Sequence, residues 1–200
     1  MTMIKPMLLR AAVLAPLVLL SGCLGLGGGK PPPTLLRLNP AASAPVGVAV
    51  SGTPANALSI AEPEVDKQLA AMRVPVRVSD TDIAYLQNAQ WVERPARQFR
   101  SLLAETIRAG AKGLVFEDDQ PVPASGRRLG GKLLEMGYDA RTSSVVVRYD
   151  ALLSGPRDAV TVRRFEARVS GVQAKPAAVG RALNEAANTV AAEVAAWVVG

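Results

Sequence analysis

The sequence predicts an α/β domain in which one mixed β-sheet is packed by two main helices, at about residues 92–109 and 176–199. Two observations carry this prediction. Short segments with alternating apolar residues fill the first half of the chain, and a helical periodicity interrupts them. Three longer strand patterns then precede an alanine-rich helical pattern. Because a strand, a helix and a strand occur in that order, we expect a crossover with at least one parallel strand pair.

The chain opens with the features of a secretory signal. Lys5 and Arg10 form a short basic head, and an apolar run at residues 11–20 follows it. This run is too short to span a bilayer as a helix, and small residues come directly after it. We therefore assign residues 1–22 to a signal peptide. Its removal leaves 178 of the 200 residues, enough for one domain with a hydrophobic core.

Residues 20–23 read Leu-Ser-Gly-Cys and contain Cys23, the only cysteine in the chain. They resemble the lipobox of bacterial lipoproteins, and the resemblance implies cleavage between Gly22 and Cys23. It also implies a diacylglycerol on the Cys23 thiol and an acyl chain on the new amino terminus, which together would anchor the protein firmly to a membrane. Leu24 stands where an aspartate would favour retention in the inner membrane, so the resemblance implies the outer membrane. The alternative is an ordinary signal whose apolar run ends beside a buried cysteine.

Composition excludes several classes of function. The chain contains no histidine, so it lacks the commonest general base and the commonest metal ligand. We therefore expect no catalytic residues, no metal site and no cofactor beyond the acyl chains on Cys23. The net charge of +6 falls to +4 without the two charges of the signal, and it is spread along the chain. Without a basic block, and with few aromatic residues, we expect no binding to nucleic acid.

A tether and three short strands are predicted next. Glycines followed by three prolines make residues 23–33 a flexible tether with a stiff end. Strand patterns then occur at residues 34–38, 46–50 and 58–61. Glu62, Glu64 and Asp66 follow within a short span, but Pro63 keeps the chain extended and splays them. A solvated loop is therefore favoured over a metal site or an acid–base site.

A fourth strand and the first main helix occupy the middle of the chain. Residues 73–78 alternate apolar and basic positions, and Pro75 suggests an edge strand or a place where one backbone donor is not needed. The first main helix has Pro95 in its first turn, where the missing donor does no harm, and Gly110 at its end. A short strand at residues 114–116 follows it.

The second half predicts three long strands and the second main helix. The strands are expected at residues 128–139, 143–153 and 160–171. Three glycines in the first of them indicate bends or close approach of the backbone. In the last, the apolar positions change parity between Val162 and Phe165, which predicts a bulge near Arg163 and Arg164. The terminal helix carries charged and amide side chains, so it is not a membrane span.

Several segments together carry a family likeness. The lipobox, the tether, the terminal helix and four motifs resemble the ABC-type transport auxiliary lipoproteins, a PqiC-like family; the motifs are residues 35–38, 73–78, 83–86 and 89–91. The resemblance covers a domain at residues 34–200 and implies a mixed α/β fold. It also implies a non-enzymatic, periplasmic, outer-membrane-anchored component of a phospholipid transport system. The implied partners are an MCE-domain protein and an inner-membrane ABC permease with its ATPase, and a homo-oligomer is compatible with this role.

Tyr85 and Trp91 are the candidate partner-contact residues. If residues 83–86 are exposed beside the helix start, the two aromatics can anchor a protein partner. The alternative is that both pack under the first helix, because only eight aromatic residues are available to the core. A second function also stays open, a stand-alone periplasmic lipoprotein that binds lipid or another small molecule. A hydrolase is disfavoured, since the chain has neither histidine nor a Gly-x-Ser-x-Gly elbow.

Overall fold

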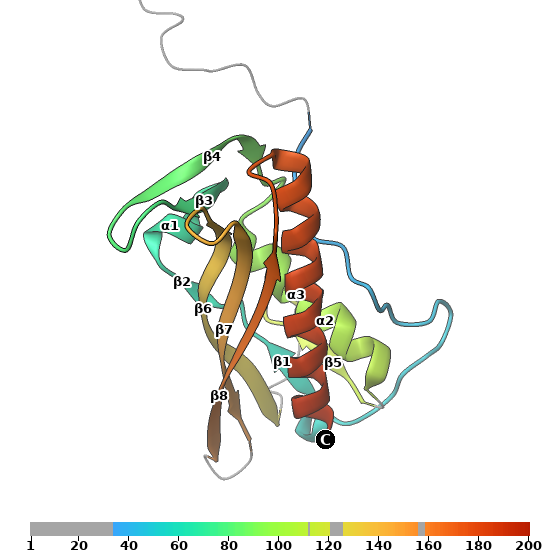
Figure 1. The fold of residues 1–200 in the computed structure, drawn as a ribbon. Helices are drawn as coiled ribbons and strands as arrows, with labels where there is room; N and C mark the ends of the chain where they lie inside the picture. The colour runs from blue at the N-terminus through green and yellow to red at the C-terminus, as the bar shows by residue number, and fades with distance from the viewer. Residues whose placement is uncertain (1–33, 112, 121–125, 156–158) are drawn as a thin grey trace, which may run out of the picture. The chain divides into compact units, whose positions relative to one another are not determined.

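The computed structural model describes residues 34–111, 113–120, 126–155 and 159–200, all within one unit of the chain, Pro32–Gly200 (Figure 1). The predicted signal peptide, the tether and Cys23 lie outside the described residues. Within these, eight strands form one mixed sheet and helices pack against it, which confirms the predicted fold class. The strands are β1 (Leu58–Ile60), β2 (Glu64–Val65), β3 (Arg73–Arg77), β4 (Ile83–Gln90), β5 (Val115–Glu117), β6 (Arg127–Asp139), β7 (Ser144–Ser154) and β8 (Val160–Ser170). The α-helices are α1 (Lys67–Ala70), α2 (Pro95–Gly110) and α3 (Pro176–Val199).

The sheet is built around the long strand β6. On one side β6 pairs antiparallel with β7, which pairs antiparallel with β8. On its other side three short strands follow one another, all parallel to it: β1, β2 and then β3. The outer strands β5 and β4 pair with β1 and β3, parallel and antiparallel respectively. The parallel pairs confirm the predicted crossover.

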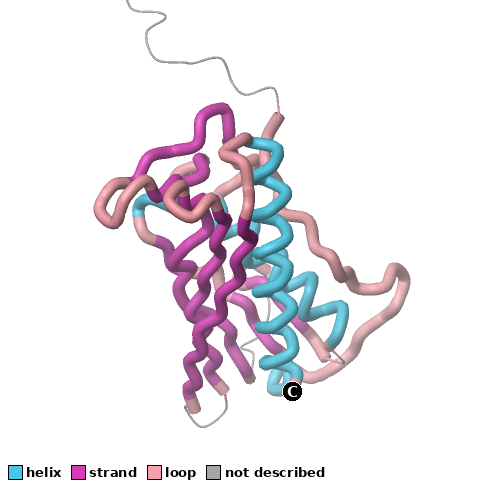
Figure 2. The backbone as a smooth tube through the Cα atoms, viewed as in Figure 1, coloured by secondary structure: helices cyan, strands magenta, loops and turns pink. Residues whose placement is uncertain are grey.

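Helices α2 and α3 lie on one face of this sheet (Figures 1 and 2). α3 packs against β7 and β8, α2 packs against β1 and β5, and the two helices pack on each other. Arg100 of α2 is buried, with its Nε 3.1 Å from Glu117 Oε2 and its Nη2 2.6 Å from Asp119 Oδ2. A buried guanidinium needs such partners, and these tie the helix to the end of β5.

The hydrophobic core lies between the two helices and the inner face of the long strands. Val145, Val147 and Tyr149 of β7 are fully buried, as their period of two predicts. Phe99 of α2 meets the Tyr149 ring edge-on, with ring centroids 5.2 Å apart. The Tyr149 hydroxyl donates a 2.5 Å hydrogen bond to the Gly130 carbonyl oxygen, and burial raises the pKa of this hydroxyl. Tyr149 therefore packs in the core and bonds the backbone of β6.

Two glycines of β6 confirm the predicted close approach of the backbone. Gly131 has a φ of +127°, and a Cβ there would lie 2.0 Å from the Asp150 carbonyl oxygen. A Cβ on Gly137 would lie 2.6 Å from the Pro75 carbonyl oxygen. Since atoms cannot approach so closely, a larger residue at either position must displace a neighbouring strand.

The first described segment of the chain is held by helix side chains. The Leu38 amide donates to Gln98 Oε1 of α2 at 2.9 Å. The Asn39 amide donates to Asn184 Oδ1 of α3 at 2.7 Å. These side-chain acceptors hold residues 38 and 39 against both helices, whereas the Leu36 amide donates to the Gln90 carbonyl oxygen at the end of β4.

Two of the early strand predictions are wrong. Residues 46–50 form a loop, and their three valines are at least half exposed. Alternating valines favour a strand, but this preference depends on a neighbouring strand, and here none lies beside the segment among the described residues. Residues 34–38 contribute only an isolated bridge, between Leu36 and Trp91.

The predicted position of Pro75 at a sheet edge is also wrong. β3 lies between β4 and β6. The pairing of β3 with β4 is irregular between Arg73 and Pro75. A proline is tolerated there because the break in the ladder leaves one backbone donor without a role. The sequence had allowed this alternative beside the edge position.

The bulge predicted in the last strand lies instead in β6. β8 pairs with β7 in unbroken register through Arg163 and Arg164. The register shift occurs between Leu133 and Glu135, in the pairing of β6 with β7. The change of parity in β8 has a simpler cause, since Val162 is 63% exposed and lies on the outer face of the sheet.

Candidate functional site

The strand β4 forms an edge of the sheet and carries Tyr85. Among the described strands β4 pairs with β3 alone, and the Leu36 amide donates to the Gln90 carbonyl oxygen only at its far end. The outer side of its first half therefore presents backbone groups that are not paired in the sheet. Ile83 is 45% exposed and Ala84 is exposed. We name residues 83–85 the β4 edge. Exposed apolar side chains beside free backbone groups make it suited to binding an extended segment of another protein.

Tyr85 is half-buried and held in place by its neighbours. The Arg73 guanidinium carbon lies 4.5 Å from the centroid of the Tyr85 ring, within the range of a cation–π contact. The Tyr85 hydroxyl donates a long hydrogen bond of 3.5 Å to the Gln68 carbonyl oxygen of α1. The ring is thus fixed against its own sheet, and its remaining exposed part is available for contact.

Trp91 lies in the hydrophobic core. Its side chain is 1% exposed and belongs to the same core cluster as Phe99 and Leu103 of α2. Its backbone amide donates to the Met72 carbonyl oxygen at 2.9 Å, while the indole Nε1 has no hydrogen-bond partner among the described residues. The structure therefore leaves Tyr85 half-buried and places Trp91 in the core, and a role of either in partner binding stays a prediction.

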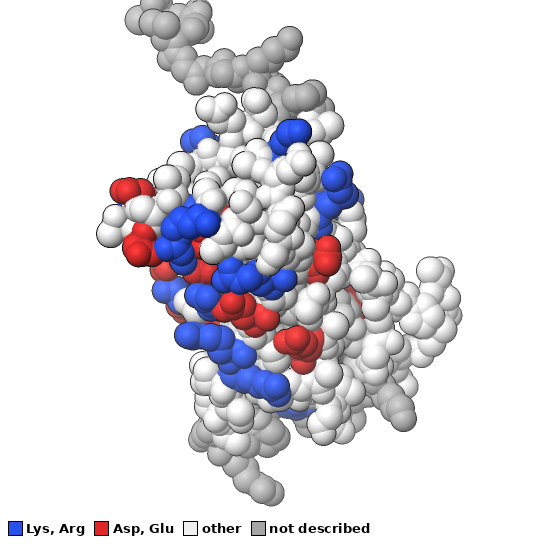
Figure 3. All heavy atoms as spheres, in the orientation of Figure 1, with Lys and Arg blue, Asp and Glu red and all other residues white. Residues whose placement is uncertain are grey.

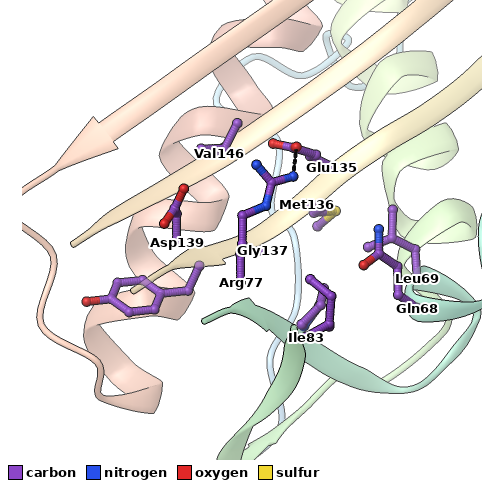
Figure 4. Close-up of a pocket in the computed structure, with 11 residues that line it drawn as sticks. Gln68, Leu69, Arg77, Ile83, Glu135, Met136, Gly137, Asp139 and Val146 are labelled. Carbon is purple, nitrogen blue, oxygen red and sulfur yellow. Dashed lines mark hydrogen bonds and ion pairs between the residues drawn. The ribbon is translucent and has the colours of Figure 1, made fainter. Parts of the chain in front are cut away.

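A small cleft lies beside the β4 edge, between β3, β6 and α1 (Figure 4). Arg77 reaches over it toward Glu135, and the two side chains form an ion pair. Ile83 and Leu69 line the other side of the cleft. Its cavity volume is about 40 Å³, room for only a few water molecules. The cleft can receive the end of one side chain from a partner, and it is too small for a lipid.

The outer face of β6, β7 and β8 carries a ladder of ion pairs. Arg148 bridges two strands, with its Nη1 3.1 Å from Glu135 Oε1 and its Nε 2.6 Å from Glu166 Oε2. Arg164 Nε lies 2.6 Å from Asp150 Oδ1 on the next rung. The hydrogen bond from Arg148 lowers the pKa of Glu166, and the one from Arg164 lowers the pKa of Asp150. Figure 3 shows basic and acidic side chains interleaved on the side where these strands lie, so the positive charge is locally compensated.

The acidic residues at 62–66 do not converge on one point. Glu62 Oε1 lies 3.5 Å from Arg94 Nη2, whereas Asp66 Oδ1 lies 2.7 Å from Lys132 Nζ. Within the four described ranges, no group of three or more histidine, cysteine or acidic side chains could hold a metal ion. None of the described helices is long and apolar enough to cross a membrane.

A family model matches residues 37–195 of the chain, and it describes an ABC-type transport auxiliary lipoprotein component. Because this match spans most of the chain, the protein belongs to that family. The family is one of lipoproteins that serve ABC-type transport systems. The resemblance carried by the sequence motifs is therefore confirmed.

Two solved structures are similar in fold. A Xanthomonas campestris protein of the family DUF330 matches with a TM-score of 0.70 at 16% identity, covering 83% of this chain and 94% of that one. An uncharacterised protein matches with a TM-score of 0.63 at 17% identity, covering 72% of this chain and 92% of that one. No curated protein matches the chain significantly by sequence. At these identities the structural likeness shows a shared fold and nothing more.

Proposed function

We propose that the protein is an outer-membrane-anchored periplasmic lipoprotein that serves as a non-enzymatic docking component of an MCE-type, ABC-driven phospholipid transport system. The observation that carries the proposal is the family match over residues 37–195, which begins shortly after the predicted lipid-attachment residue Cys23. The tether between them allows the domain to reach roughly 35 Å from the membrane surface, at about 3.3 Å for each extended residue.

The β4 edge is the surface that we assign to docking. Its apolar side chain Ile83 and its unpaired backbone suit the addition of a strand from a partner, with Tyr85 as a fixed aromatic contact. The small cleft beside it gives one partner side chain a place to insert. By contrast, the ion-pair ladder on β6–β8 already uses its charges internally, so it offers less to a partner.

A matched pair of substitutions tests this assignment. Ile83→Asp places a charge on the β4 edge, and Val162→Asp places one on the opposite edge strand β8, at a residue that is also exposed. The full-length lipoprotein, reconstituted in vesicles, is titrated with the MCE-domain protein of the same organism. We expect Ile83→Asp to weaken binding at least tenfold and Val162→Asp to leave it unchanged. Equal affinities for both variants and the wild type would show that docking uses another surface.

The anchor is tested separately with labelled palmitate. The full chain should incorporate the label and fractionate with the outer membrane, because the lipobox assigns three acyl chains to Cys23. Cys23→Ala should lose both properties, whereas Cys23→Ala protein that still fractionates with membranes contradicts the proposed anchor. Lipid that copurifies in the absence of any transport partner would favour the second function, a stand-alone binder of lipid or small molecules.

A further inference from the structure

An open groove lies where the ends of α2 and α3 meet β1 and β5. Its walls include Leu58, Ile107, Leu114, Val115, Val198 and Val199, and we name it the terminal groove. Its cavity volume is about 400 Å³, ten times that of the cleft beside the β4 edge. Pockets that hold small ligands in proteins have volumes of roughly 300–1,000 Å³. The terminal groove is therefore large enough for a ligand.

The chemistry of the walls selects the class of ligand. Among the described residues, the side chains that line the groove are aliphatic except for Asn56 and Arg127, and none of them is aromatic. Such walls offer no ring for stacking and few directed hydrogen bonds, so they suit a flexible hydrocarbon chain. Arg127 Nη2 donates to the Val198 carbonyl oxygen at 2.9 Å, so this guanidinium is engaged at the end of α3 and the aliphatic side chains set the character of the groove.

Two glycines leave the groove open. A Cβ on Gly110 would meet no atom within 4 Å, and a Cβ on Gly113 would meet only the Asn56 carbonyl oxygen at 3.9 Å. Neither glycine has a positive φ, so the backbone does not require glycine at these positions. The missing side chains therefore matter for the free volume of the groove and not for the turn of the chain.

We propose that the terminal groove binds one acyl chain of a lipid, with the chain along the aliphatic walls. This goes beyond docking, because the domain itself then handles lipid. The groove and the β4 edge share no residue, so a variant of one surface leaves the other intact. The two proposals can consequently fail independently.

Photocrosslinking of the full-length protein tests the groove. One arm uses vesicles of phosphatidylglycerol that contain a photoactivatable acyl chain, and the other uses free photoactivatable palmitate, so that the two arms distinguish a phospholipid from a free fatty acid. Adducts are mapped by mass spectrometry. We expect them on peptides that contain Leu114 and Val115 or Val198 and Val199. Labelling of these peptides in either arm supports the proposal and identifies the lipid source.

Gly110→Trp fills the groove without a backbone clash, and we expect it to reduce this labelling at least tenfold. Val199→Trp provides a second blocking variant at a residue that is half exposed. The matched control is Ala177→Trp, an exposed position about 30 Å away along α3. Circular dichroism and the thermal midpoint verify that each variant is folded. Adducts spread over the whole surface, labelling that persists in folded Gly110→Trp and Val199→Trp, or no adducts in either arm would overturn the proposal.

Discussion

Tyr149→Phe should change the response of the protein to alkaline pH. The Tyr149 hydroxyl is buried and donates to the Gly130 carbonyl oxygen at 2.5 Å. Its removal should cost about 1–2 kcal/mol of unfolding free energy at pH 7, through the lost hydrogen bond and the carbonyl left without this donor. The hydroxyl also makes the stability of the protein depend on pH, because burial raises its pKa in the folded protein.

The sign of the pH effect follows from the direction of the shift. In the unfolded chain Tyr149 ionises near pH 10, whereas in the folded protein it stays neutral to higher pH. Its contribution to stability is therefore complete below about pH 10 and is lost progressively as the pH rises toward the raised folded pKa. At pH 11 the unfolded state of the wild type gains about 1.4 kcal/mol from this ionisation, and the Phe variant gains nothing.

Urea unfolding followed by tryptophan fluorescence measures the difference between the two proteins at each pH. Wild type should be more stable by about 1–2 kcal/mol at pH 7, and the gap should shrink to less than about 1 kcal/mol at pH 11. All other titrating groups are common to both proteins, so they cancel in the difference. A gap that stays constant between pH 7 and pH 11 would refute the assignment of a buried, neutral hydroxyl.

Three further predictions concern the domain. Gly131→Ala should destabilise the protein by roughly 2–5 kcal/mol in urea unfolding, because a Cβ at φ +127° would lie 2.0 Å from the Asp150 carbonyl oxygen; a cost below about 1 kcal/mol would contradict this geometry. Phe99→Ala should cost about 3–5 kcal/mol in the same assay, because it opens a cavity against Tyr149; a near-neutral result would place Phe99 outside the core. The hydrogen bond from Arg141 lowers the pKa of Asp139, so its stabilisation is present above about pH 4 and is lost as the pH falls through the folded pKa. Asp139→Asn should accordingly flatten the acid limb of a plot of thermal midpoint against pH, and an unchanged acid limb would count against the pair.

The long strands and both main helices could be predicted from the sequence because their periodicity is regular. In β7, for example, the odd-numbered residues from Val145 to Ala151 are fully buried, and Pro95 and Gly110 mark the ends of α2. Residues 46–50 show the limit of such patterns, since their valines favour a strand only where another strand is available. Whether a partner strand is available depends on the tertiary fold, and the alternation of residues alone does not reveal it.

β4 is hidden in the sequence for a different reason. Its second half is polar and irregular, and Asn88 adopts a φ of +55°, which breaks the alternation expected of a strand. The pairing of β3 with β4 skips several β4 residues between Tyr85 and Gln90. The sequence pattern therefore identified residues 83–86 as a motif without indicating that they form an edge strand.

The candidate sites show the same limit. The sequence could single out Tyr85 and Trp91 as candidates, but only the fold separates the half-buried ring from the fully buried one. The terminal groove has no sequence signal, because it brings together Leu58, Ile107 and Val198 from three distant elements.

The hydrogen bonds that join residues 38 and 39 to the two helices affect how the domain would respond to mechanical tension. A pull on the chain ahead of residue 34 first reaches the Leu36 amide, which donates to the Gln90 carbonyl oxygen at the end of β4. It then reaches the backbone amides held by Gln98 of α2 and Asn184 of α3, so tension is shared between the end of β4 and two helices that pack on each other. For a domain on a membrane tether, such an attachment would spread a pull on the anchor over several hydrogen bonds, none of which involves the β4 edge.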